Sequence, residues 1–161
     1  MPATKVKMRV REEAALPTDL YELDFNAWTI EQAAALRDGR TSDLDFVNLA
    51  EEVEDLGGAV FKELRSSFRI ILVHMLKWDH QPERRSRSWA GSIKTHRLEI
   101  SFTLKRNPSL RRRQVEAIAI AYSLAKIRAS VEMKRPEREL PPDCPYDLDE
   151  ILHRSFEWPE A

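Results

Sequence analysis

Two tryptophans, Trp78 and Trp89, bracket a polar segment that carries Arg84, Arg85 and Arg87. A guanidinium group forms forked hydrogen bonds with carboxylates and phosphates, and it also stacks on indole rings. In one interpretation the segment is a helix connector, and at least two of the three arginines bind carboxylates of the same chain. In the other interpretation the arginines form a contact surface for another molecule.

The basic character continues into the residues that follow Trp89. The candidate interaction surface comprises Trp78, Gln81, Arg84, Arg85, Arg87, Trp89, Lys94 and Arg97. Binding to nucleic acid needs a longer stripe of cations, which Lys105, Arg106, Arg111, Arg112 and Arg113 would extend. The chain has no recognised DNA- or RNA-binding motif, and its formal net charge is -1. We therefore expect a protein partner, with nucleic acid as the alternative.

Charge is unevenly distributed along the chain. Residues 84–113 hold ten basic side chains and one acid, Glu99, whereas residues 43–63 hold seven acids and one base, and residues 137–161 hold eight acids and two bases. Pairing between acidic and basic helices of the same chain would neutralise this pattern. A basic face that attracts phosphate or an acidic partner is the functional alternative.

Three side chains lie on or beside apolar helix faces and define a possible metal site: Glu52, His74 and His96. The Glu-x-x-His motif of carboxylate-bridged bundles occurs only once, at Glu150 to His153, and such sites need it on two helices. We therefore expect the three side chains not to converge, and we predict no metal, cofactor or catalytic residue. A metal-dependent bundle enzyme remains the third hypothesis.

Nucleophilic catalysis has little support in the sequence. It contains neither a Gly-x-Ser-x-Gly elbow nor a glycine-rich phosphate loop. The single cysteine, Cys144, excludes an internal disulfide, and its proline-rich surroundings favour a small apolar contact. We lean towards a non-enzymatic protein.

The spacing of apolar residues predicts the helices that position these groups. Thr29 and Gln32 form a capping box that opens a short helix ending at Gly39. An apolar stripe at 3-4-3-4 spacing follows over residues 46–60, and we expect Gly57-Gly58 to break this helix. Residues 61–78 have apolar side chains around most of the helix and should form its most buried part, with Phe68, Ile71, Leu72, Met75 and Leu76 nearly fully buried.

Apolar spacing, caps and prolines also predict the helices in the second half of the chain. A helix is predicted over residues 87–106, and Asn107-Pro108 opens another that stops before Pro136. Residues 140–145 are extended because three prolines interrupt them. Asp147 and Glu150 cap a last short helix, after which Phe156 and Trp158 should dock on the body of the protein.

The fold class predicted from these elements is all-α. The chain has 161 residues, 42% of them hydrophobic, with only 4 glycines and no strand-like alternation. We expect a polar extension over residues 1–18 and a single domain over residues 19–161. This domain should be an up-and-down bundle of four main helices, with short N-terminal helices and a docked C-terminal tail. The longest uncharged run, residues 117–125, is too short to span a membrane.

Several ordered motifs carry a family resemblance. They are Tyr21-Glu22-x-Asp24-Phe25-x-Ala27-Trp28-Thr29, Asn48-Leu49-x-Glu51-Glu52-Val53-Glu54-x-Leu56-Gly57, His74-Met75-Leu76-Lys77-Trp78, the segment from Gln81 to Trp89, Cys144-Pro145-Tyr146 and Trp158-Pro159. Together they resemble domain-of-unknown-function family 29 over roughly residues 20–160. The resemblance implies an all-helical fold and a bacterial source, and it implies no reaction. With no secretory signal in the first 16 residues, we expect a cytoplasmic protein.

Overall fold

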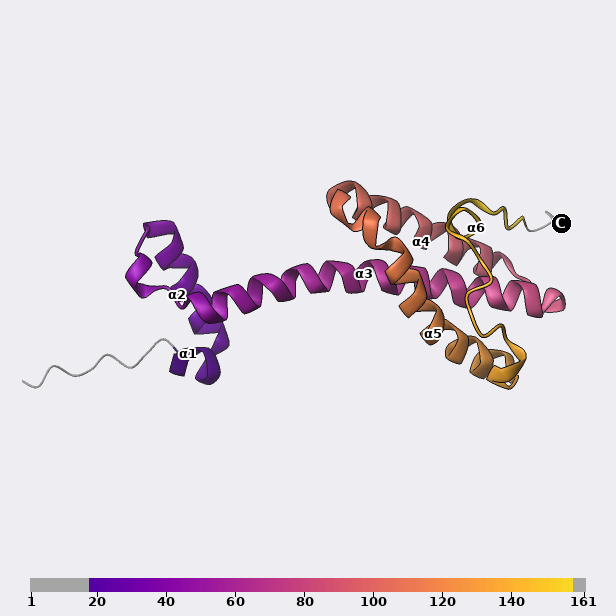
Figure 1. Ribbon diagram of the computed structural model, residues 1–161, viewed down its shortest axis with the longest axis horizontal. Helices are drawn as coiled ribbons and strands as arrows, with labels where there is room; N and C mark the ends of the chain where they lie inside the picture. The colour runs from indigo at the N-terminus through magenta and orange to yellow at the C-terminus, as the bar shows by residue number, and fades with distance from the viewer. Residues whose placement is uncertain (1–17, 158–161) are drawn as a thin grey trace, which may run out of the picture. The chain divides into compact units, whose positions relative to one another are not determined.

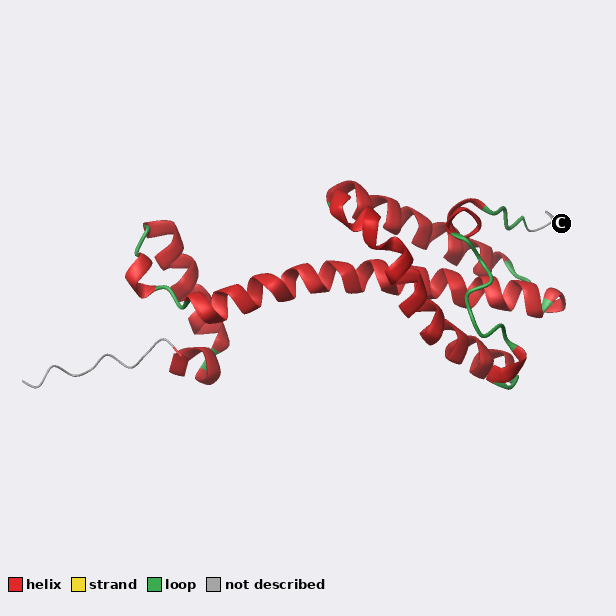
Figure 2. Ribbon diagram, in the orientation of Figure 1, coloured by secondary structure: helices red, strands yellow, loops and turns green. Residues whose placement is uncertain are grey.

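The computed structural model describes residues 18–157, and within this range the chain is helical with no strand. Six α-helices are present there, and four of them, α2 to α5, are long (Figures 1 and 2). The all-α class predicted from the sequence is therefore confirmed. By their internal contacts, residues 1–55 and 56–161 form two compact units. Residues 1–17 of the polar N-terminal extension lie outside the described range.

The first unit contains α1 (Thr18–Leu23), α2 (Phe25–Asp38) and the start of α3 (Phe46–His80). The predicted start of α2 at Thr29 is wrong: α2 begins at Phe25, because the Asp24 side chain accepts a hydrogen bond from the Ala27 amide and caps the helix. The predicted end is confirmed, since Gly39 adopts a left-handed conformation with φ of 69°.

A small aromatic and polar cluster holds the first unit together. The buried Trp28 ring packs edge-on against Tyr21 at 4.9 Å between centroids. Its indole nitrogen donates to Asp45 at 3.3 Å, and Gln32 accepts a hydrogen bond of 2.8 Å from the Asp45 amide. These bonds satisfy buried polar groups at the turn into α3 and so fix its first residues.

Helix α3 runs without interruption from Phe46 to His80, so the predicted break at Gly57-Gly58 is wrong. Each glycine costs about 1 kcal/mol in a helix, which weakens α3 at this point but does not end it. The exposed stripe on its first half includes Phe46, Val53 and Leu56. The four long helices are therefore α2, α3, α4 and α5, with α3 counted once because it is not divided at Gly57.

The second unit is built on the C-terminal half of α3, with α4 (Arg87–Arg106) running back along it and α5 (Gln114–Met133) crossing it (Figure 1). The five residues predicted to be the most buried, Phe68, Ile71, Leu72, Met75 and Leu76, each have a relative exposure of 0%. The predicted bounds of α4 are confirmed, and the Ser86 hydroxyl accepts a hydrogen bond from the Trp89 amide at its start. Pro108 opens a 3₁₀ segment before α5, and α5 ends before Pro136 as predicted.

The C-terminal segment returns across the second unit. Asp147 and Glu150 form the predicted capping box of α6 (Leu148–His153). Tyr146 and Ile151 are buried, and the half-buried Phe156 packs against the core, which confirms the predicted docking for this residue. Trp158 lies outside the described residues. None of the helices described here combines the length and the apolar character needed to cross a membrane.

Candidate protein-binding groove

The eight residues predicted as an interaction surface fall into two groups. Trp78 and Gln81 are buried, and Arg85, Trp89 and Arg97 are half-buried, so their side chains hold the fold together. The exposed members are Arg84, Arg87 and Lys94. The sequence motif therefore mixes packing residues with residues that are available to a partner.

The arginines between the two tryptophans do not pair with carboxylates. Among the described residues, Arg84, Arg85 and Arg87 have no ion-pair partner, so the prediction that at least two would bind acids is wrong. Arg85 instead donates to the Trp78 carbonyl oxygen at 2.9 Å, with its guanidinium 5.2 Å from the Trp78 ring. A carbonyl in the last turn of α3 lacks a helical donor, and Arg85 supplies one.

Arg97 fastens the C-terminal segment to α4. Its guanidinium donates to three carbonyl oxygens, those of Ile151 at 2.8 Å, Arg154 at 2.8 Å and Glu150 at 3.1 Å. These carbonyls lie at the end of α6, where the helix leaves carbonyls without donors, although the Glu150 carbonyl also accepts from the Arg154 amide at 3.1 Å. Burial, followed by the nearby charge of Arg154, lowers the pKa of Arg97 below its usual value. Arg97 is therefore committed to the fold and is not free to bind a partner.

A second clamp joins the end of α3 to the tail. Arg154 donates to both carboxylate oxygens of Asp79, at 2.9 and 2.5 Å, and the Tyr146 hydroxyl donates to Asp79 at 2.9 Å. Burial alone raises the pKa of Asp79, but the bonds from Arg154 and Tyr146 outweigh it, so this pKa lies below its usual value. Burial and the Asp79 charge raise the pKa of the Tyr146 phenol.

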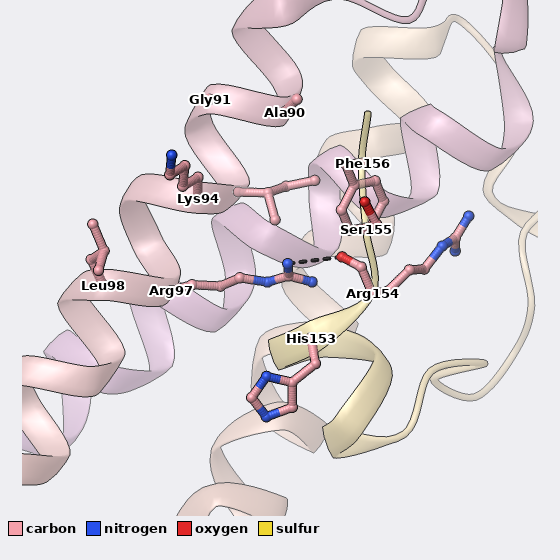
Figure 3. Close-up of a pocket in the computed structure, with 10 residues that line it drawn as sticks. Ala90, Gly91, Lys94, Arg97, Leu98, His153, Arg154, Ser155 and Phe156 are labelled. Carbon is pink, nitrogen blue, oxygen red and sulfur yellow. Dashed lines mark hydrogen bonds between the residues drawn. The ribbon is translucent and has the colours of Figure 1, made fainter. Parts of the chain in front are cut away.

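With the tail held in this way, a groove of about 540 Å³ opens between α4 and residues 153–156, and we call it the α4–tail groove (Figure 3). Its α4 wall includes Gly91, Lys94 and Leu98, and its tail wall includes His153 and Phe156. A Cβ atom added at Gly91 would meet no heavy atom within 4 Å, so the groove is open above this glycine. In Figure 3 the Arg97 guanidinium reaches across to the Arg154 carbonyl and joins the two walls.

The outer face of α4 continues this groove. Arg87, Gly91, Lys94 and Leu98 follow 4-3-4 spacing and therefore share one helix face. All four are exposed, and neither Arg87 nor Lys94 has a carboxylate partner among residues 18–157. The face thus presents two available cations and, one turn beyond Lys94, the exposed Leu98 side chain.

Trp89 belongs to a different cluster, on the α5 side of α3. The Lys77 ammonium lies 2.7 Å from Glu132 and 4.4 Å from the centroid of the Trp89 ring, and the Lys77 residue is 9% exposed. His74 lies beside the same ring, and its Nδ1 atom is buried with no hydrogen-bond partner among the described residues. Burial, with the Lys77 charge, lowers the pKa of His74 to about 4, so this imidazole is neutral at pH 7.

The residues of the hypothetical metal site have other contacts. Glu52 accepts a hydrogen bond of 2.8 Å from the Tyr21 hydroxyl. The Nδ1 atom of His96 lies 2.5 Å from the Oε2 atom of Glu99. In the part of the chain that the structure describes, no group of three His, Cys, Asp or Glu side chains is arranged to hold a metal ion. Cys144 is half-buried against the core, and burial raises the pKa of its thiol.

These features define an all-helical protein with a clamped C-terminal segment and a groove along α4. A family model described as domain of unknown function DUF29 matches residues 20–157, and the chain belongs to this family. The resemblance seen in the sequence is thereby confirmed. No curated protein and no solved structure gives a significant match to the chain.

Proposed function

We propose that this protein is a non-enzymatic interaction module that binds an acidic, partly apolar segment of another protein in the α4–tail groove. The observation that carries this proposal is the exposed face of α4, where Lys94 lies one turn before Leu98 and Arg87 lies two turns before Lys94. Neither cation has a carboxylate partner among residues 18–157. The expected setting is the bacterial cytoplasm.

Affinity and orientation would come from different parts of the groove. Burial of Leu98 and of the groove surface near Gly91 would supply the apolar part of the binding free energy. Arg87 and Lys94 would attract an acidic segment from solution and fix its register on α4. Arg97 and the Asp79–Arg154 pair hold the two walls in place, so the groove is formed before binding.

A labelled synthetic peptide with glutamates at both ends and leucines at its centre is a suitable probe for this groove. Its binding can be followed by fluorescence anisotropy. The double variant R87E/K94E should bind about tenfold more weakly or worse, which corresponds to about 1.4 kcal/mol. Arg138→Glu, which reverses another exposed arginine of the same unit, is the matched control and should leave binding unchanged. Equal losses in both variants, or no binding to the unmodified protein, would contradict the proposal.

Nucleic-acid binding is the second candidate, and a different set of side chains favours it. Lys105, Arg106, Arg111 and Arg112 are exposed at the end of α4 and in the following 3₁₀ segment, and none has an ion-pair partner among residues 18–157. If they bind phosphates, affinity for a labelled DNA duplex should fall steeply with salt concentration. R111E/R112E should then abolish duplex binding, and R87E/K94E should have a smaller effect.

A further inference from the structure

Helix α5 exposes an apolar stripe that the proposed function does not use. Ile120, Leu124, Ile127 and Val131 follow 4-3-4 spacing, and their relative exposures are 37%, 43%, 50% and 71%. This is the spacing of the contact positions in a two-helix coiled coil. A neighbouring face of α5 packs into the core through Ala117, Ala121, Ala125 and Ala129, which are all fully buried.

The stripe borders a shallow apolar groove of about 400 Å³. Leu124, Ile127 and Val131 line it on α5, and Arg69 lines it on α3. Exposed apolar patches of this kind, rimmed by polar side chains, mark protein contact sites. We therefore expect another protein surface to cover the stripe.

We infer that the stripe binds its own counterpart on a second copy of the chain, with the two α5 helices antiparallel. In that arrangement Leu124 lies opposite Ile127 of the second copy, and Ile120 lies opposite Val131. Both pairs share one register, so all four apolar side chains of each copy meet apolar partners. The stripe is thus self-complementary about a twofold axis.

The charges at the two ends of the stripe favour the same arrangement. Glu116 precedes the stripe and Lys134 follows it, and both are exposed. Glu116 accepts two hydrogen bonds from Arg113 of its own chain, but this pair is exposed and such pairs contribute little, so Lys134 of a second copy can compete for the carboxylate. Lys134 is the first residue after α5, so the two charges stand at opposite ends of the stripe. An antiparallel pair brings Glu116 of each copy to Lys134 of the other, whereas a parallel pair would place like charges together.

This geometry allows a direct test on the unmodified protein. A zero-length carbodiimide joins a carboxylate to an amine that touches it. Within one chain, Glu116 and Lys134 are separated by about 27 Å along the helix, so they cannot be joined there. A Glu116–Lys134 cross-link in a band of twice the chain mass, identified by peptide mass spectrometry, would therefore report the antiparallel dimer.

Sedimentation of variants completes the experiment. Leu124→Glu and Val131→Glu should each abolish the dimer and the cross-link, with helicity kept by circular dichroism. Lys134→Arg removes the amine but keeps the charge, so it should lose the cross-link and keep the dimer. Val115→Glu, at an exposed position on another face of α5, is the control and should change neither. A protein that is monomeric at all concentrations, or a dimer that survives both stripe variants, would overturn the inference.

Discussion

Arg154 donates to both carboxylate oxygens of Asp79, at 2.9 and 2.5 Å, and so joins residues that are 75 positions apart in the sequence. About a third of each side chain is exposed. Such a forked pair is more favourable than an ordinary surface ion pair because its geometry is fixed by two hydrogen bonds. The pair holds the tail wall of the α4–tail groove in position against the end of α3.

Replacing Arg154 by alanine should therefore lower the free energy of unfolding by about 1–2 kcal/mol. Because the pKa of Asp79 is lower in the folded protein, the pair stabilises the fold above the ordinary pKa of the carboxyl, 3.8, and loses this effect as the pH falls below it. Urea unfolding from pH 5 to pH 2 measures both effects. A variant as stable as the parent at pH 5 would show that the clamp contributes nothing.

His74 should make stability depend on pH in a separate range. Its pKa is about 4 in the folded protein, below the usual 6.5, so the unfolded chain binds the proton more tightly. The free energy of unfolding should therefore fall as the pH decreases from 6.5 to 4, with a slope that approaches one proton. His74→Leu removes the titrating group and should flatten this slope. If the free energy of unfolding of the variant depends on pH as steeply as that of the parent, His74 is not the group that causes this dependence.

Gly57 and Gly58 offer a test of the continuous α3 helix. Both are exposed, and a Cβ atom at either position would meet nothing within 4 Å. Alanine at each position should raise the free energy of unfolding by about 0.5–1 kcal/mol, because alanine loses less backbone entropy in a helix. Thermal unfolding of G57A, G58A and the double variant provides the measurement. A destabilised alanine variant would indicate a turn at this point.

Leu72→Ala tests the core of the second unit. Leu72 has a relative exposure of 0%, and truncation should cost about 2–5 kcal/mol through lost burial and the cavity that remains. Leu98→Ala removes the same atoms at a position that is 53% exposed, and it should cost much less. Denaturant unfolding of the two variants gives the comparison. Similar losses of stability in both variants would contradict the assignment of Leu72 to the buried face of α3.

The helices of the second unit were predictable because their apolar spacing and their caps agree. In the second unit, Ser86 and the Asp147–Glu150 box mark helix starts through local hydrogen bonds, and such signals can be read from neighbouring residues. In the first unit, Gly39 marks the end of α2 through its left-handed conformation. The uninterrupted path of α3 through Gly57 was not predictable, because a cost of about 1 kcal/mol for each glycine lowers helix propensity without deciding whether the helix continues.

The site was predictable in part. Arg87 and Lys94 belong to the eight residues predicted as an interaction surface, but the sequence did not distinguish them from the members that are buried in the structure. The role of Arg97 was missed, because its partners lie 53 to 57 residues away and are backbone carbonyls, which carry no sequence signal. One hint was present: Arg97 stands four residues after Ile93 and three before Ile100, beside the apolar face of α4.

The most direct test of the proposed function is a nuclear magnetic resonance titration of the isotope-labelled protein with the acidic, leucine-centred peptide. We expect the largest amide shift changes on Gly91, Lys94 and Leu98 of α4 and on Ser155 and Phe156 of the tail. Amides near Arg138 should stay unchanged. Shift changes confined to the segment from Lys105 to Arg112, or to the exposed stripe of α5, would contradict the assignment of the binding site to the α4–tail groove.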